Sequence, residues 1–308
     1  MRGKRYAVIG DIHFNSTEFS DYILESFFDI VNSIKEDGGV SYAVILGDIF
    51  DKPILTPDLA FNISKYLNAL VDATLDKKVI IVCGNHDYSP RYNVSAIKYL
   101  ESNTIQIIDE ITVIDNFCYV PHSYKTQTII DKYKVVFSHT GIANLQISTT
   151  YSYTSQDIIS FNTNPDLLFL GHIHTPFDGV VDNVPTIIPG SICPVNWSDS
   201  SDQRYFYIYK GTNREKVIKI KHPYTVTVHE GEDMPTDQNI LIRMVLSDPK
   251  NIEKYDKSLI KSVAVEKIRK TNHRGLEMVD LIKSLCAQYG ASYTPVKEIL
   301  EGVGLVVR

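Results

Sequence analysis

Polar side chains follow five apolar runs in the N-terminal part of the chain, at the point where each run ends. The runs read YAVIGDIH, YAVILGDIFD, VIIVCGNHD, VVFSHT and LLFLGHIH, and each is typical of a buried strand. In open α/β sheets, ligand sites lie outside the carboxyl ends of the strands. Carboxylate and amide oxygens mixed with imidazoles favour Mn, Fe or Zn over Ca or Mg. We therefore predict one two-metal site, formed by Asp11, His13, Asp48, Asn85, His139, His172 and His174.

One such cluster alone would be weak evidence. Gly-Asp at a strand end is often part of a turn, and a histidine there can be satisfied by the backbone. Five clusters in series favour metal chemistry, because nothing about folding demands that pattern.

The length of 308 residues exceeds one average domain of about 150 residues. We expect a large domain over residues 1–211 and a smaller one over residues 212–308. The start of the chain leads directly into a strand, and no apolar run is long enough for a signal peptide or a membrane span. We expect a cytoplasmic protein without membrane contact. The four cysteines are far apart, so neither a disulfide framework nor a zinc finger is indicated.

The net charge of −6 argues against a generic nucleic-acid binder, but the two expected domains differ in charge. Residues 212–308 carry more basic than acidic side chains, whereas residues 1–211 are acidic. Part of that acidity comes from the expected metal-binding carboxylates, which bound cations would neutralise. A mildly basic unit attached to an acidic one is compatible with a polyanionic substrate.

Apolar spacing predicts helices over residues 21–35, 56–75 and, more briefly, 94–100, separated by strands. From residue 105 onward the chain is rich in strands. This order predicts two mixed sheets packed face to face with helices outside, an α/β class in four αββα layers. Strands over residues 240–245 and 262–268 and an amphipathic helix over residues 275–289 predict a small α+β unit at the C-terminus.

The ordered set GDIH, GDIFD, GNHD, SHT and GHIH resembles the signature of the calcineurin-like metallophosphoesterases. Within that superfamily the chain is most similar to SbcD-type nucleases, the Mre-type subunit of double-strand-break processing complexes. The segments IIPGSICPVNWSDS and RYFYIYKG resemble the place where such chains pass from the catalytic domain to a capping domain. The first motif departs from many relatives, which have a Trp before the His, and the C-terminal region is short.

The resemblance implies a metallophosphoesterase sandwich with two divalent metal ions, Mn being expected. Asp48 would bridge the metals, and a hydroxide shared between them would attack phosphorus. The first metal would be held by Asp11, His13, Asp48 and His174. The second would be held by Asp48, Asn85, His139 and His172.

Two further residues receive catalytic roles from the same resemblance. His86 matches a histidine that does not bind metal and that stabilises the transition state or protonates the departing oxygen. Asp51 matches a carboxylate that pairs with this histidine in the superfamily's phosphatases, although some relatives have a His there. For Asp87 we favour a supporting or turn role, and for His122 an exposed loop position.

The basic residues of the C-terminal unit are the best candidates for contact with a DNA backbone. They are Lys261, Lys267, Arg269, Lys270 and Arg274, with His273 in the same run. A solvated face of a small domain is an equally good interpretation of this run. Tyr151 and Tyr153 could stack on unpaired bases, but half-buried loop aromatics are the simpler reading.

The favoured hypothesis is a Mn-dependent DNA phosphodiesterase, a 3′-to-5′ exonuclease with endonuclease activity. It would bind DNA, act as a homodimer with an SbcC-type ATPase, and work in the cytoplasm, or the host cytoplasm if it comes from a phage. The alternative is a small-molecule phosphodiesterase or phosphatase of the same superfamily. A third reading, a DNA-binding scaffold with a vestigial site, is disfavoured because every expected ligand is present.

Overall fold

The architecture is that of a computed structural model, which describes the following parts of the chain. They are residues 3–14, 19–52, 56–89, 94–123, 127–142, 158–197, 199, 203–235, 240–247, 249–255 and 260–265. No helix among these residues is long and apolar enough to cross a membrane.

The first of two six-stranded sheets has the order β17-β16-β1-β2-β3-β6. Neighbouring strands from β1 to β6 run parallel, while β16 and β17 form an antiparallel hairpin at one edge. The bounds are β1 Arg5–Ile9, β2 Tyr42–Ile45, β3 Lys78–Val82, β6 Ile105–Ile108, β16 Tyr205–Lys210 and β17 Asn213–Lys219.

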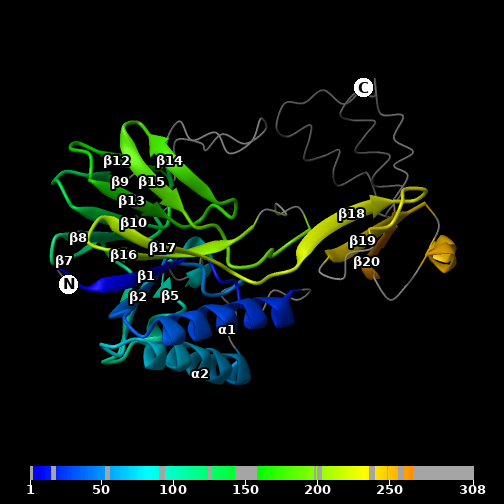
Figure 1. Cartoon of the computed structure of the whole chain (residues 1–308), viewed down its shortest axis with the longest axis horizontal. Coiled ribbons are helices and arrows are strands. Elements are labelled where there is room, and N and C mark those ends of the chain that lie inside the picture. Colours follow the sequence, from blue (N-terminus) through cyan, green and yellow to red (C-terminus); the bar gives the residue numbers. More distant parts are fainter. Residues whose placement is uncertain are drawn as a thin grey trace, which may run out of the picture.

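Helices α1 (Ser20–Asp37) and α2 (Pro57–Ala73) cover one face of this sheet (Figure 1). Their apolar stripes pack into one core with the facing strand residues. Thr56 caps α2 by accepting a hydrogen bond from the Leu59 N–H at 3.3 Å. The predicted helix over residues 94–100 is wrong, because this segment holds the short strand β5 (Val94–Ser95) and a 3₁₀ turn (Lys98–Leu100). Strand β5 pairs with β4 (Tyr88–Ser89), and this pairing requires an extended backbone in β5 where we expected a helix.

The second sheet has the order β14-β15-β13-β10-β8-β7 and packs against the first. The layer between the two sheets is aromatic, and the rings of Phe137 and Phe169 are stacked with centroids 5.2 Å apart. The strands are β7 Thr112–Ile114, β8 Phe117–Val120, β10 Val135–Ser138, β13 Leu167–Leu170, β14 Phe177–Val181 and β15 Val184–Ile188. The expected α/β sandwich is therefore confirmed.

A three-stranded sheet covers the outer face of the second sheet in the described residues, where we expected helices. It contains β9 (Gln127–Ile129), β11 (Gly141–Ile142) and β12 (Ile158–Phe161). Ile129 and Ile159 are buried against the second sheet. Between them, the hydroxyls of Thr128 and Ser160 lie 3.0 Å apart on the exposed side. Buried and exposed residues therefore alternate along these segments with a period of two, as is typical of β-strands.

A smaller sheet follows the sandwich and contains the parallel strands β18 (Tyr224–His229), β19 (Ile240–Leu246) and β20 (Ile260–Val265). It lies to one side of the sandwich (Figure 1). The residues 249–254 form a 3₁₀-helix. The predicted helix over residues 275–289 lies outside the described residues.

The expected division after residue 211 remains a prediction. Residue 211 lies in the turn between β16 and β17, and both strands of that hairpin belong to the first sheet. The large sheet therefore extends to Lys219. Residues 220–223 connect it to the smaller sheet.

Candidate metal centre

The expected ligands come from both six-stranded sheets. Strands β1, β2 and β3 are parallel neighbours in the first sheet, and β10 and β13 are parallel neighbours in the second. Each of the five is followed by one of the polar clusters. The clusters meet where the carboxyl ends of these strands lie together, as the topology of parallel sheets requires.

The glycines before Asp48 and Asn85 are required by the closeness of the neighbouring clusters. A Cβ atom on Gly47 would lie 2.3 Å from His139 Nδ1, and one on Gly84 would lie 2.1 Å from Asp48 Oδ1. Both distances are far inside van der Waals contact. The Gly-Asp and Gly-Asn pairs therefore allow the ligands to crowd together.

Three of the ligands also adopt left-handed backbone conformations. The φ angles are 57° for His13, 46° for Asp48 and 73° for His172. Such conformations cost free energy for residues other than glycine and cluster at functional sites. The carbonyl of Asp48 stabilises this arrangement by accepting hydrogen bonds from the N–H groups of Ile12 and His13, at 3.1 and 2.8 Å.

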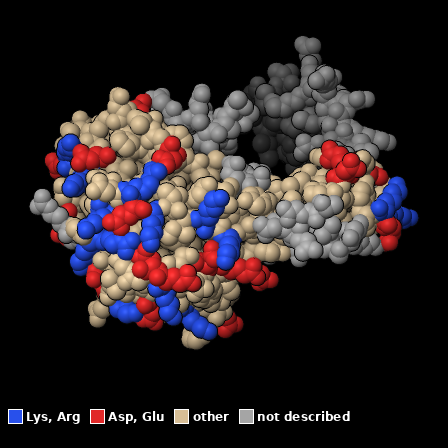
Figure 2. All heavy atoms as spheres, in the orientation of Figure 1, with Lys and Arg blue, Asp and Glu red and all other residues tan. Residues whose placement is uncertain are grey.

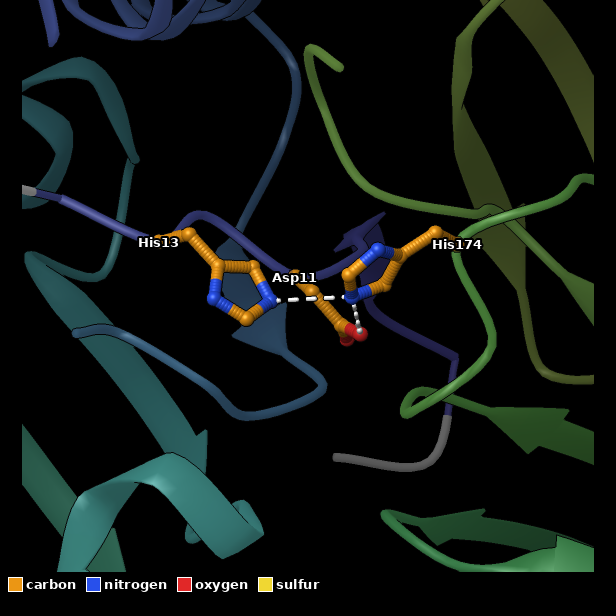
Figure 3. Close-up of side chains that lie close together, drawn as sticks. All are labelled: Asp11, His13 and His174. Atoms are coloured by element: carbon orange, nitrogen blue, oxygen red, sulfur yellow. Dashed lines mark hydrogen bonds and ion pairs between the residues drawn. The ribbon is translucent and has the colours of Figure 1, made fainter. Parts of the chain in front are cut away.

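One group of ligand atoms contains Asp11, His13 and His174 (Figure 3). The Nε2 atoms of His13 and His174 lie 3.1 Å apart, and His174 Nε2 lies 4.0 Å from Asp11 Oδ2. Asp11 and His13 are fully buried, whereas the His174 side chain is 25% exposed. The ring nitrogens and the carboxylate face one another closely enough to surround one cation.

A second group contains Asp48, His139 and His172, with the amide of Asn85 between the two rings. Asn85 Oδ1 lies 3.0 Å from His139 Nε2 and 2.9 Å from His172 Nδ1. His139 Nε2 lies 3.3 Å from Asp48 Oδ2. Two imidazole nitrogens and two oxygens thus lie close enough together to bind one cation.

One carboxylate oxygen is close to both groups. Asp48 Oδ2 lies 3.6 Å from His13 Nε2 in the first group and 3.3 Å from His139 Nε2 in the second. This is the geometry that a bridging carboxylate needs. A third group of nearby ligand atoms joins His13, Asp48 and His86. The partition of the ligands between two metals remains a prediction.

Two of the histidine rings are oriented by partners on their Nδ1 atoms. His139 Nδ1 lies 2.6 Å from the carbonyl oxygen of Leu46, and His174 Nδ1 lies 3.2 Å from Asp199 Oδ2. A proton held on Nδ1 leaves Nε2 unprotonated and able to bind a metal. In both residues it is Nε2 that faces the other ligands of the same group.

The buried charges of the site need a cation. Burial, together with the nearby Asp48 carboxylate, raises the pKa of Asp11 to about 7. Burial opposes a charge on His139, but Asp48 and Asp11 outweigh it and raise its pKa to about 9. Burial lowers the pKa of both His13 and His172 to about 3, which keeps their rings in the neutral, ligating form. The donor set and its charge fit divalent metals.

His86 lies beside the first group, with its ring centroid 5.0 Å from that of His13. Its backbone N–H donates to Asp48 Oδ1 at 2.9 Å, and its Nδ1 lies 2.5 Å from the carbonyl oxygen of Asp51. We expected the carboxylate of Asp51 to contact His86, but the contact is made by the backbone carbonyl of Asp51. The carboxylate lies 3.9 Å from His13 Nδ1, and the Asp51 carbonyl is the group that faces the His86 ring.

Other polar side chains support the ligand loops. The Asp87 carboxylate is buried and accepts hydrogen bonds from the N–H groups of Gly84 and Ile49, both at 2.9 Å, in keeping with the supporting role expected of it. His122, expected to be exposed, is 6% exposed, and its ring centroid lies 6.0 Å from that of His172. Sequence reasoning missed Asp199. Its only signal was its place in the tract WSDS, which resembles SbcD-type chains.

The expected DNA-binding residues cannot be placed. Lys267, Arg269, Lys270 and Arg274 lie outside the described residues, and so do Tyr151 and Tyr153. Lys261 is in β20, but its side chain is outside the described part. The DNA contact of this unit remains a prediction.

The sequence profile of the calcineurin-like phosphoesterases matches residues 4–176, more than half of the chain. The chain belongs to this family, and it is a metal-dependent phosphoester hydrolase. The matched segment contains all seven expected ligands. No curated protein sequence matches the chain.

Several solved structures resemble the chain at low identity. A novel archaeal phosphodiesterase is 15% identical, with 70% of this chain and 99% of that chain covered and a TM-score of 0.37. The nuclease MPE of Pseudomonas putida is 17% identical, with 59% and 73% covered and a TM-score of 0.33. A Thermotoga maritima protein is 15% identical, with 70% and 99% covered and a TM-score of 0.33.

Proposed function

We propose that this protein is a Mn-dependent DNA phosphodiesterase, a 3′-to-5′ exonuclease with endonuclease activity. The observation that carries the proposal is the position of Asp48 Oδ2 between the two groups of ligand atoms. Asp11, His13, Asp48 and His174 would hold one metal, and Asp48, Asn85, His139 and His172 the other. Metals held by these residues would supply activation of water and withdrawal of charge from the phosphate oxygens.

His86 is the proposed proton donor to the departing oxygen. Its Nδ1 faces the carbonyl of Asp51, which can only accept a hydrogen bond, so Nδ1 carries a proton in every charge state. The proton that can be transferred is therefore the one on Nε2. The Asp51 carbonyl fixes the ring, which is how Asp51 would assist.

The segment IIPGSICPVNWSDS, which resembles SbcD-type nucleases, contacts the proposed metal ligands. This contact supports a nucleic-acid substrate. The Ile192 N–H donates to the Asp11 carbonyl at 2.9 Å, and the Ser191 N–H donates to the His174 carbonyl at 3.3 Å. Asp199, in the same segment, orients the His174 ring. The resemblance therefore concerns residues that contact the proposed ligands.

A small-molecule phosphodiesterase or phosphatase is the second candidate. In Figure 2, lysines and arginines lie next to acidic residues over the visible face of the sandwich. For example, the side chains of Arg5 and Lys216 both contact Asp37. Charges of both signs are therefore interspersed on this face, and a small substrate would need no continuous basic path.

Hydrolysis assays separate the two candidates. Purified protein with Mn²⁺ would be given linear duplex DNA, bis-p-nitrophenyl phosphate and cyclic nucleotides, with His86→Ala as the control. Release of nucleotides from DNA ends that is lost in His86→Ala is the expected result. Activity on the small esters alone, with or without an added SbcC-type ATPase, would contradict a DNA substrate.

We also propose that the protein forms a homodimer and works with an SbcC-type ATPase in a DNA end-processing complex. The resemblance of residues 187–211 to the SbcD-type passage into a capping domain supports this. Light scattering would measure the dimer. Co-purification with a candidate ATPase would test the complex, and a monomer that binds no ATPase would contradict both.

A further inference from the structure

His174 is held at two points by residues that follow the last ligand motif. Its ring Nδ1 lies 3.2 and 3.3 Å from the two carboxylate oxygens of Asp199. Its backbone carbonyl accepts hydrogen bonds from the Ser191 N–H, at 3.3 Å, and from the guanidinium of Arg204. Both the ring and the backbone of this proposed ligand are therefore fixed from residues 191–204.

Arg204 is unusual among these residues because its long cationic side chain is 0% exposed. Burying a guanidinium costs free energy unless hydrogen bonds compensate for the lost water. Its Nη1 atom contacts the carbonyl of His174, a residue whose ring faces Asp11 and His13. The charge is thus buried directly behind a proposed metal ligand.

This contact is closely packed against Gly190. Gly190 has a left-handed φ of 78°, and a Cβ atom there would lie 2.5 Å from the His174 carbonyl oxygen and 3.1 Å from Arg204 Nη1. The Arg204 backbone is fixed as well, because its N–H donates to His222 Nε2 at 3.1 Å. His222 lies in the connection to the smaller sheet, so Arg204 is anchored between the metal centre and that connection.

We infer that Arg204 is a positioning residue for the ligand His174. By holding the His174 carbonyl, its guanidinium keeps the ring nitrogen Nε2 beside Asp11 Oδ2 and His13 Nε2. The inference rests on the proposed two-metal site. Partners that orient a metal ligand typically contribute a factor of about 10 to 100 in metal affinity.

Calorimetric titration of metal-free protein with Mn²⁺ tests this role without any activity assay. We expect wild-type protein to bind two Mn²⁺. Arg204→Met, which removes the donors and the charge, should bind one of the two about 10 to 100 times more weakly and leave the other unchanged. Arg204→Lys, which keeps a buried cation, should lose less.

The matched control is Arg214→Met. Arg204 directly precedes β16, and Arg214 lies in the next strand, β17. The guanidinium of Arg214 pairs with Asp178 at 2.5 and 2.8 Å, and its side chain is 35% exposed. Its replacement should leave both Mn²⁺ affinities unchanged. Thermal unfolding followed by circular dichroism would show whether each variant is folded.

A double-mutant cycle with His174→Ala makes the test specific. If Arg204 acts through His174, Arg204→Met should cause no further loss of Mn²⁺ affinity once His174 is absent. Unchanged affinity in both Arg204 variants, or equal weakening of both metals, would overturn the inference. If Arg204→Met does not fold, the affinities of Arg204→Lys for the two Mn²⁺ ions are compared with those of the wild type in the same way. Wild-type protein that binds no Mn²⁺ would instead overturn the proposed function itself.

Discussion

The two groups of ligands are held in place by different parts of the molecule. His139 is fully buried, and its ring Nδ1 and its backbone N–H are bonded to the carbonyls of Leu46 and Val120, at the ends of strands. His174 is one-quarter exposed, and it depends on the side chains of Asp199 and Arg204. The fold therefore fixes the His139 group through its backbone, while single substitutions can loosen the His174 group.

Replacing Asp48, which lies between the two groups, should have the largest effect. Asp48→Asn removes the shared negative charge, and we expect Mn²⁺-dependent hydrolysis of bis-p-nitrophenyl phosphate to fall roughly 10³-fold, because bound metals contribute several kcal/mol to such reactions. Calorimetry should show weaker binding of both Mn²⁺ ions. Loss of only one ion would mean that the groups do not share this carboxylate.

Replacing His86, which lies beside the His13 ring, should change turnover and leave metal binding intact. We expect His86→Ala to lower kcat about 100-fold, the usual contribution of a positioned acid or base. Titration should still give two Mn²⁺ per chain. If His86→Ala loses a metal ion, His86 belongs to the ligand groups.

Replacing Asp199 should affect the His174 group alone. Asp199→Ala removes the acceptor for His174 Nδ1, and we expect about 10-fold weaker binding of one Mn²⁺. Asp199→Asn keeps an oxygen acceptor and should retain more of the affinity. An equal loss for both ions would show that the two groups are not held separately.

The smallest effect on the site is expected from Asp37, in an ion-pair network at the C-terminal end of α1. The hydrogen bond from Arg5 at 2.6 Å, with a contact from Lys216, lowers the pKa of Asp37 to about 2. A lowered pKa stabilises the fold above the unfolded value near 3.9, and this contribution is lost as the pH falls towards about 2.

Asp37→Asn should therefore lower the free energy of unfolding by about 1 kcal/mol at pH 7, with a smaller difference from wild type near pH 2. Urea unfolding at several pH values measures this difference. The affinity for Mn²⁺ should not change. A change in metal binding would mean that the stability of the sandwich, and not its local contacts, controls the site.

The strands and ligand clusters could be predicted because local signals specify them. Apolar runs that end in Gly-Asp, Gly-Asn or Ser-His identify both the strand and its ligand, and the parallel topology then brings the clusters together. The short strands β9 and β12 were missed. They are only three and four residues long, and their buried faces are set by the second sheet on which they pack.

The supporting residues could not be predicted in the same way. Arg204 reaches the His174 carbonyl across 30 positions of sequence, and Asp51 contributes its carbonyl where its carboxylate was expected. Both contacts depend on backbone direction and on tertiary packing. Residue type and spacing carry neither piece of information.

Two metals on either side of Asp48 can be located by anomalous diffraction from crystals grown with Mn²⁺. We predict two peaks about 3.5–4 Å apart, one beside Asp11, His13 and His174 and the other beside Asn85, His139 and His172. A single peak, or two peaks that do not share Asp48, would contradict this prediction.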